Sequence, residues 1–598
     1  MDIRLIEYFG VALKEVSDLT PERVNGISNQ YGYAVHPDCC NESVMKWLDT
    51  KSTNYNSTFY KNIEEVTSRD RLTLFIEQII SYAITYGRGE MFSMNDSDYS
   101  EVPEIRKYKV ILPISKEELF EKCINILYSG IALKQDTMEA LCEYVVEADG
   151  SWDINKVANK EAQCYLIDLT DIMPVDPFTI IRYINFKVTG ATQIVKDEAL
   201  LHRYKYGKLF NMNVLNESTL KTLSSIFYRY KPVFLGLGKQ STNNKKIVNR
   251  LRRMAVKNHK PFTAGFWETI VSTPHSAKEL KERLELDAPS NFKIIRLIQA
   301  VRENRAKIGV SGNVYSMYNI RNGRVWYKKE GVQMALSPKY GWWDLLEEML
   351  YNELVARLSK KACTIKLPEA INLVCPTSEK TFIGNIPFGS YYDMQNHNMI
   401  GIYWRNEWGT HDFDLSFTDY EGSKIGWNSS FYNRNNSIVY SGDMTNANPE
   451  ASEVLYMANG CPNGMIKVNR YSGVSGSKFK FCVAQSEVES LPKNYMIDPN
   501  TIKFETMVES TDAESFIGFV ADGRLYMCDF KSGDRQVSRN VGVNDYVEAL
   551  KRKTRSFVDL RQLLVDAGFK IRKQERKNSP IEIDLSELDK GSLIELFS

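Results

Sequence analysis

The hydrophobic period of this chain changes near Lys366-Leu367-Pro368. Before that point, apolar residues recur at three- and four-residue spacing, as expected for α-helices. After it, short runs of alternating apolar residues are broken by Gly, Asn and Pro, as expected for the strands of a β-sandwich. Pro368 also disfavours continuation of the preceding helix. The sequence therefore predicts an α+β multidomain protein: a helical N-terminal array over residues 1–365, a β-sandwich over 366–540, and a C-terminal helix and tail over 541–598.

Local signals set the limits of several predicted elements. A Ser-x-x-Glu capping box at Ser115 and Glu118 opens one helix, and Asp136 has a suitable side chain to cap the next. Asn322-Gly323, between apolar flanks, predicts a β-hairpin with a type I′ turn. Apolar recurrence and terminal signals predict helices over 68–87, 115–133, 136–146, 342–361, 541–564 and roughly the last twelve residues.

Three aspartates in the sandwich region are candidates for a metal site. Asp412 and Asp414 alternate with Phe413 and Leu415, so on a strand the two carboxylates share one face. Asp443 ends a second strand-like run that begins at residue 437. Carboxylates that converge at the end of a hairpin form the all-oxygen site that calcium prefers. The alternative is that they are solvated aspartates at loop ends.

The same residues carry a resemblance to a known family. The run Asp412-Phe413-Asp414-Leu415-Ser416, with Ser441-Gly442-Asp443 beginning 25 residues after it, resembles the core signature of the tellurium-resistance TerD-type domain. The resemblance implies a TerD-like β-sandwich that binds calcium through Asp412, Asp414 and Asp443. The family usually continues with an acidic, Gly-rich loop, whereas residues 444–453 hold only Glu450 and Glu453. The resemblance therefore implies one calcium site and leaves a second without support.

The resemblance extends weakly into the first half of the chain. Residues 58–61, 78–87 and 231–261 are similar to a large bacterial family in which a helical part precedes a TerD-type domain. This implies a non-catalytic interaction protein of a tellurium-resistance-type stress or phage-defence system. Its expected partners are other proteins of that system, including acidic TerD-type domains.

One segment is strongly basic, although the charges of the whole chain nearly cancel. Residues 203–260 hold fourteen Lys or Arg and one acid, Glu217, which gives a local charge of +13. Over 245–259 the pattern predicts a helix with an apolar stripe through Val248 and Leu251. Its exposed flank would carry the cations that suit a row of phosphates: Lys246, Arg250, Arg253 and Lys257.

Three interpretations of this segment remain open. It is a solvated basic face neutralised by acidic helices elsewhere, a surface for RNA or another polyanion, or a surface for an acidic protein. Under the second interpretation, nearby aromatic rings could stack on bases: Tyr204, Tyr206, Phe227, Tyr228 and Tyr230. An RNA-binding helical scaffold with a β-sandwich appendage is therefore the alternative function.

Composition and missing motifs narrow the function classes. The 76 basic and 75 acidic residues nearly cancel, so the whole chain shows no general affinity for nucleic acids or membranes. The ten cysteines are scattered, without a Cys-x-x-Cys pair, which disfavours zinc and disulfides. The first residues lack the apolar core of a signal peptide, and no run suits a membrane span, so we expect a cytoplasmic protein. Because no nucleotide-binding or hydrolase motif occurs, the sequence favours binding over catalysis.

Overall fold

The computed structural model describes most of the chain, and it divides the chain into two compact units. The helical unit consists of Met1–Leu5, Ile114–Lys293 and Glu595–Ser598, and the sheet unit consists of Ile6–Pro113 and Ile294–Ile594. The described residues are 2–15, 17–28, 33–51, 72, 76, 109–148, 150–194, 201–261, 263–307, 314–319, 325–330, 339–409, 412–432, 437–447, 450–488, 491, 495–510, 513–530, 540–573 and 580–598.

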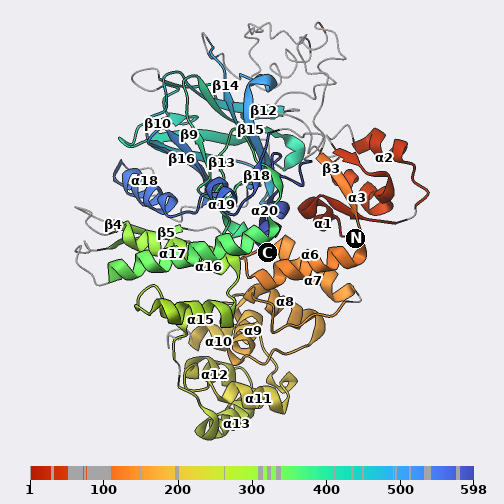
Figure 1. The fold of residues 1–598 in the computed structure, drawn as a ribbon, viewed down its shortest axis with the longest axis vertical. Helices are drawn as coiled ribbons and strands as arrows, with labels where there is room; N and C mark the ends of the chain where they lie inside the picture. Colours follow the sequence, from red (N-terminus) through yellow and green to blue (C-terminus); the bar gives the residue numbers. More distant parts are fainter. Residues whose placement is uncertain are drawn as a thin grey trace. The chain divides into compact units, whose positions relative to one another are not determined.

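Several helices that follow one another along the chain pack side by side in the helical unit, as predicted (Figure 1). The capping box at Ser115 and Glu118 is present, and the helix ends at Gly130 in the left-handed conformation. The predicted cap at Asp136 is wrong: Lys134 is the N-cap residue, and Asp136 lies in the first turn. The helices are α6 (Lys116–Ser129), α7 (Gln135–Glu147), α8 (Lys160–Thr170), α9 (Pro177–Thr189), α10 (Leu201–Tyr206), α11 (Glu217–Ser224), α12 (Lys231–Gly238), α13 (Thr242–Asn258), α14 (Phe266–Thr269) and α15 (Ala277–Asp287).

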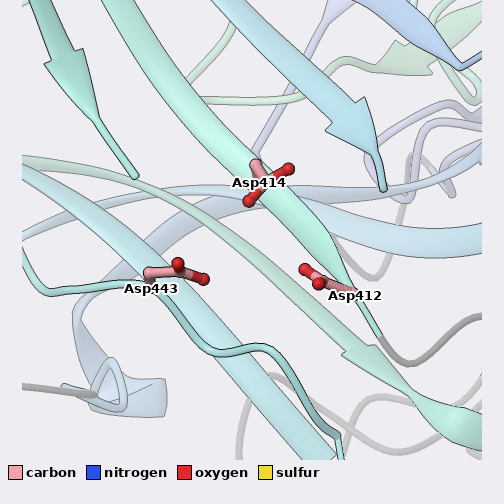
Figure 2. A group of neighbouring side chains, drawn as sticks. All are labelled: Asp412, Asp414 and Asp443. Carbon is pink, nitrogen blue, oxygen red and sulfur yellow. The ribbon is translucent and has the colours of Figure 1, made fainter. Parts of the chain in front are cut away.

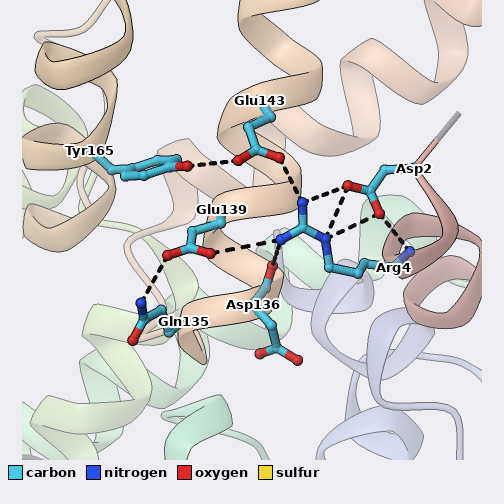
Figure 3. A network of polar contacts seen from close by, with 7 residues as sticks. All are labelled: Asp2, Arg4, Gln135, Asp136, Glu139, Glu143 and Tyr165. Atoms are coloured by element: carbon cyan, nitrogen blue, oxygen red, sulfur yellow. Dashed lines mark hydrogen bonds and ion pairs between the residues drawn. The ribbon is translucent and has the colours of Figure 1, made fainter.

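Arg4 ties the start of the chain to α7 within the helical unit (Figure 3). Its guanidinium donates to Asp2 and, at 2.6 Å, to Oε2 of Glu143, and it lies 3.8 Å from Glu139. The other oxygen of Glu143 accepts a hydrogen bond from the Tyr165 hydroxyl of α8 at 2.6 Å. This network joins three segments of the unit, and because its members are partly exposed it contributes modestly to stability.

Two antiparallel sheets form the centre of the sheet unit, as predicted for residues 366–540 (Figure 1). The six-stranded sheet has the order β10-β9-β13-β16-β17-β7, and the five-stranded sheet has the order β11-β12-β8-β14-β15. The strands are β7 (Tyr391–Asp393), β8 (Asn398–Arg405), β9 (Phe413–Asp419), β10 (Lys424–Gly426), β11 (Ile438–Tyr440), β12 (Glu450–Met457), β13 (Gly464–Arg470), β14 (Ser477–Gln485), β15 (Ile502–Ser510), β16 (Glu514–Ala521) and β17 (Arg524–Phe530).

The core lies between the two sheets. The Phe413 ring of β9 packs edge-on against Trp404 of β8 and Phe479 of β14, with ring centroids 5.9 and 5.0 Å apart. The opposite face of the six-stranded sheet is covered in part by α18 (Asn540–Arg555), whose Val547 and Leu550 join a cluster with Met465 and Phe519 among others. The side chains of β9 from Phe413 to Phe417 are buried on both faces of the strand, and burial of apolar area is the main stabilising term of such a unit.

The C-terminal segment up to Ile594 is part of the sheet unit rather than an appended tail. β18 (Lys570–Ile571) and β19 (Ile583–Asp584) pair in parallel with the two edges of β6 (Thr364–Lys366). The boundary predicted near residue 365 falls inside this strand and inside one compact unit. The predicted helix over 541–564 is confirmed at its start but is wrong as one continuous helix. α18 ends at Arg555, and Asp559 caps a new helix, α19 (Leu560–Asp566), by accepting from Gln562 N–H at 2.7 Å.

Of the remaining predictions, three elements are confirmed and one region is wrong in part. The predicted hairpin is confirmed by β4 (Val314–Asn319) and β5 (Val325–Glu330), which pair antiparallel. The helices α17 (Lys339–Leu358) and α20 (Lys590–Phe597) also match predicted helices. The mainly helical start is wrong in part, since β1 (Val11–Leu13), β2 (Tyr33–Val35) and β3 (Lys109–Ile114) form a sheet.

Some predictions lie outside the described residues: nearly all of the helix over 68–87, the turn at 322–323, and residues 58–61 and 78–87 of the resemblance. Within the described ranges, no helix is both long and apolar enough to cross a membrane.

Candidate functional site

The structure brings the three predicted aspartates together. Asp412 directly precedes β9, Asp414 lies within it, and Asp443 follows β11. One carboxylate oxygen from each residue lies within 4.8 Å of the other two. Figure 2 shows Asp412 and Asp443 pointing toward each other, with Asp414 beside the space between them. Oxygens at this separation can contact one metal ion, because calcium–oxygen distances are about 2.3–2.6 Å.

Burial makes this cluster electrostatically unfavourable when no cation is bound. Asp412 is 6% exposed and Asp414 is 2% exposed, so these two residues are not solvated loop-end aspartates. Desolvation, together with the nearby charge of Asp443, raises the pKa of Asp412 to about 6. Desolvation and the charges of Asp412 and Asp443 raise the pKa of Asp414 to about 7. A divalent cation would stabilise the ionised carboxylates that the protein environment disfavours.

Two lysines lie near Asp414 without neutralising it. Their charges lower its pKa, but desolvation and the neighbouring aspartates dominate. Lys467 of β13 forms an ion pair with Glu514 at 2.9 Å, and Lys424 of β10 donates to the Asn428 side chain. Among the described residues Asp414 forms no ion pair, and its Oδ2 atom is buried without a hydrogen-bond partner.

Asn469 offers a fourth oxygen close to the cluster. It lies directly opposite Asp414 in the β9–β13 ladder, and such facing pairs have Cβ atoms about 5 Å apart on the same side of the sheet. Asn469 is 9% exposed, and its Oδ1 atom is buried without a hydrogen-bond partner among the described residues. Amide oxygens are calcium ligands. The sequence analysis missed this residue, because register across two strands cannot be read from one sequence.

Glu453 braces the segments that carry the aspartates. It is completely buried on β12. Its Oε2 atom accepts from Leu415 N–H at 2.6 Å, and its Oε1 atom accepts from Met444 N–H at 3.1 Å. The side chain of Tyr440 also lies close to this carboxyl group. Leu415 adjoins Asp414 and Met444 adjoins Asp443, so this one side chain fixes the spacing of two site aspartates.

The prediction of a loop over residues 444–453 is wrong in part, because Glu450 and Glu453 belong to β12. Burial raises the pKa of Glu453 well above its usual value, despite the hydrogen bonds it accepts. The sequence did hold a signal for the burial of Glu453, because this residue is a lone acid just before the apolar run 454–457. A carboxyl group at such a position needs buried donors.

The second candidate region is the basic flank of α13. The predicted apolar stripe is confirmed, with Val248, Leu251 and Ala255 buried. The four predicted cations, Lys246, Arg250, Arg253 and Lys257, are all exposed. Arg250 differs from the others because it forms an ion pair with Glu217, the single acid of the segment.

The predicted stacking aromatics of this region are mostly not available. Tyr204, Phe227 and Tyr230 are 3%, 0% and 7% exposed, so they belong to the core of the helical unit. Tyr206 and Tyr228 are 65% and 44% exposed and could contact a ligand. The sequence could not separate these two groups, because all five rings occur in similar helical contexts.

Comparison with known proteins identifies no relative: the chain matches no family model, no curated protein and no solved structure. The TerD-type resemblance therefore rests on its motif residues alone.

Proposed function

We propose that this chain is a non-catalytic binding protein whose β-sandwich holds one calcium ion at Asp412, Asp414 and Asp443. The observation that carries the proposal is the convergence of three carboxylates within 4.8 Å, two of them buried and with raised pKa values. An arrangement of this kind disfavours the calcium-free state of the folded protein. Calcium would remove the repulsion, and part of its binding free energy would stabilise the fold.

The donor set favours calcium over other metals. The cluster consists of carboxylates only, with the Asn469 amide nearby. Zinc sites in proteins are built mainly from Cys and His. Magnesium binds oxygen ligands too, but it requires near-octahedral geometry and keeps several waters. A partly buried site with four candidate protein oxygens suits the larger and more adaptable ion.

The proposed setting is a tellurium-resistance-type stress or phage-defence system in the cytoplasm. The setting rests on the TerD-type motif, and the ten free cysteines agree with a reducing compartment. The proposed partners are other proteins of that system, including acidic TerD-type domains, for which the basic flank of α13 offers complementary charge.

A second candidate function is polyanion binding, RNA in particular, on the same flank. The specific observation is that Lys246, Arg253 and Lys257 are exposed and form no ion pair with described residues. When unpaired cations of this kind neutralise phosphates, the counterions condensed on the nucleic acid are released. This release favours binding at low salt concentration. A gel-shift series over salt concentration separates this function from calcium binding, which does not require these residues.

Titration calorimetry with calcium on the full chain tests the principal proposal. We expect one site per chain, and Asp414→Asn should weaken calcium binding by at least about tenfold, because it removes a charged ligand. Glu421→Gln is the matched control: Glu421 is exposed, lies in the turn after β9, and loses the same charge outside the cluster. Absence of calcium heat, or equal weakening by both variants, would contradict the proposal.

A further inference from the structure

A cavity in the helical unit lies beside the basic flank of α13. Its volume is about 830 Å³, and it is formed where the start of α9, the end of α11 and the end of α13 meet. Ligand pockets for small molecules usually measure about 300–1,000 Å³, so this cavity is large enough for a ligand of nucleotide size.

The lining of this cavity is strongly basic. The cations are contributed by three different segments of the unit, and no Asp or Glu is among the described lining residues. Unlike Arg250, the lysines at the cavity form no ion pair with described residues. Clustered positive charges attract anions into a concave site more strongly than on an open surface. The basic lining residues are Lys221, Arg229, Lys257, His259 and Lys260.

Two of these groups are held in place by packing. The Arg229 guanidinium lies over the Phe178 ring at 4.9 Å and the Tyr230 ring at 5.5 Å. The His259 ring packs edge-on against Tyr228 with centroids 5.0 Å apart, and its Nδ1 atom is buried without a hydrogen-bond partner among the described residues. Side chains that are fixed before binding lose less entropy when they bind.

The backbone that follows α13 is fixed as well. The Lys260 N–H donates to the Ser225 carbonyl at 2.8 Å, and the Asn258 side chain donates to Ser224 Oγ at 3.0 Å. Because Ser225 also lines the cavity, these bonds keep the wall that carries His259 and Lys260 against the wall that carries Lys221. These contacts hold two walls of the cavity together.

We propose that this cavity binds a small ligand with a polyphosphate chain, either an inorganic polyphosphate or a nucleoside triphosphate. Several cations from different walls match the several charges of such a chain, and Lys and Arg side chains are the groups that bind phosphate in proteins. The site is separate from the aspartate cluster, so it is independent of the proposed calcium binding.

Titration calorimetry on the full chain in calcium-free buffer tests this proposal with two probes, tripolyphosphate and ATP. The double variant Lys221→Gln/Lys260→Gln removes two cavity charges from exposed positions and leaves the apolar core intact. We expect it to weaken binding of both probes by about tenfold or more. The matched double variant Lys239→Gln/Lys245→Gln removes two exposed lysines of the same basic segment that do not line the cavity. It should weaken binding by less than about twofold.

The two probes also identify the source of the phosphate chain. Equal affinities assign an inorganic polyphosphate, and tighter ATP binding assigns a nucleoside triphosphate; either result supports the site. The proposal is overturned if neither probe binds at millimolar concentration, or if the two double variants weaken binding equally. It is also overturned if RNA with a 5′-hydroxyl end shows the same loss in the cavity variant, since the residues would then serve an extended RNA surface.

Discussion

The aspartate cluster of the sheet unit and the basic flank of the helical unit each gather like charges, but they do so in different environments. Asp412 and Asp414 are buried, and their pKa values are raised. Lys246, Arg253 and Lys257 are exposed. Water solvates the exposed cations, so they are stable without a ligand, whereas buried carboxylates need a proton or a cation. We therefore expect a bound ligand to raise folding stability at the aspartate cluster but not at the basic flank of α13.

Removal of the Glu453 brace should have the largest effect on stability. Glu453→Ala leaves two buried backbone N–H groups, of Leu415 and Met444, without their acceptor. We expect a loss of about 2–4 kcal/mol in unfolding free energy. Denaturant unfolding followed by fluorescence measures it.

Glu453→Gln sharpens this test, because the amide NH2 group can replace only one of the two accepting oxygens. It should therefore destabilise the protein as well, and it should weaken calcium binding. If Glu453→Gln were as stable as the natural chain, the brace would not need both oxygens, and the account of how the cluster is positioned would be wrong.

The pH dependence of stability without calcium should show a smaller effect. The folded-state pKa values of Asp412 and Asp414, about 6 and about 7, lie above their ordinary value of 3.8. The folded protein then holds more protons than the unfolded chain between about pH 4 and 7, so these groups reduce stability as the pH rises through that window. For Asp414 the expected loss is about 1.4 kcal/mol per pH unit within this window.

Asp414→Asn isolates this contribution, since the variant cannot titrate at that position. The difference in unfolding free energy between the variant and the natural chain, measured in chelator, should grow in favour of the variant from pH 5 to pH 8. A difference that stays constant over this range would mean that Asp414 titrates normally, and the contrast between the two regions would disappear.

Charge reversal on α13 should have the smallest effect on stability and act on binding alone. We expect Lys246→Glu/Arg253→Glu/Lys257→Glu to abolish binding of single-stranded RNA with no change in melting temperature, because the apolar stripe is untouched. For the natural chain, three phosphate contacts predict a log–log salt slope of roughly −2. Arg250 is left unchanged, because its reversal would place two acids together at Glu217.

RNA binding that survives this triple variant would show that the flank is only a solvated face. A drop in melting temperature would instead show that the exposed cations stabilise the fold, which contradicts the comparison.

Features with a local cause could be predicted from the sequence. The capping box of α6, the apolar stripe of α13 and the alternation around Asp414 each depend on residues a few positions apart. The pairing of Asp412 and Asp414 with Asp443 was also predicted, but with help from the motif. The break between α18 and α19 was signalled locally by Asp559, although the longer apolar pattern obscured it.

Features that depend on distant residues could not be predicted. Asn469 faces Asp414 only because β13 pairs with β9 in one register. The cavity in the helical unit combines residues 175–178 with residues 221–263. The sheet formed by β1, β2 and β3 joins residues 33–35 to residues 109–111, and strands this short show no clear alternation.

Melting experiments on Asp414→Asn with and without calcium test the central claim most directly. In chelator the variant should melt above the natural chain, because one repelling charge is removed. In calcium at about 100 times the dissociation constant, the natural chain should gain about 2.7 kcal/mol and melt above the variant, while Glu421→Gln should follow the natural chain in both buffers. A variant that melts below the natural chain by the same amount in both buffers would contradict calcium binding at this cluster.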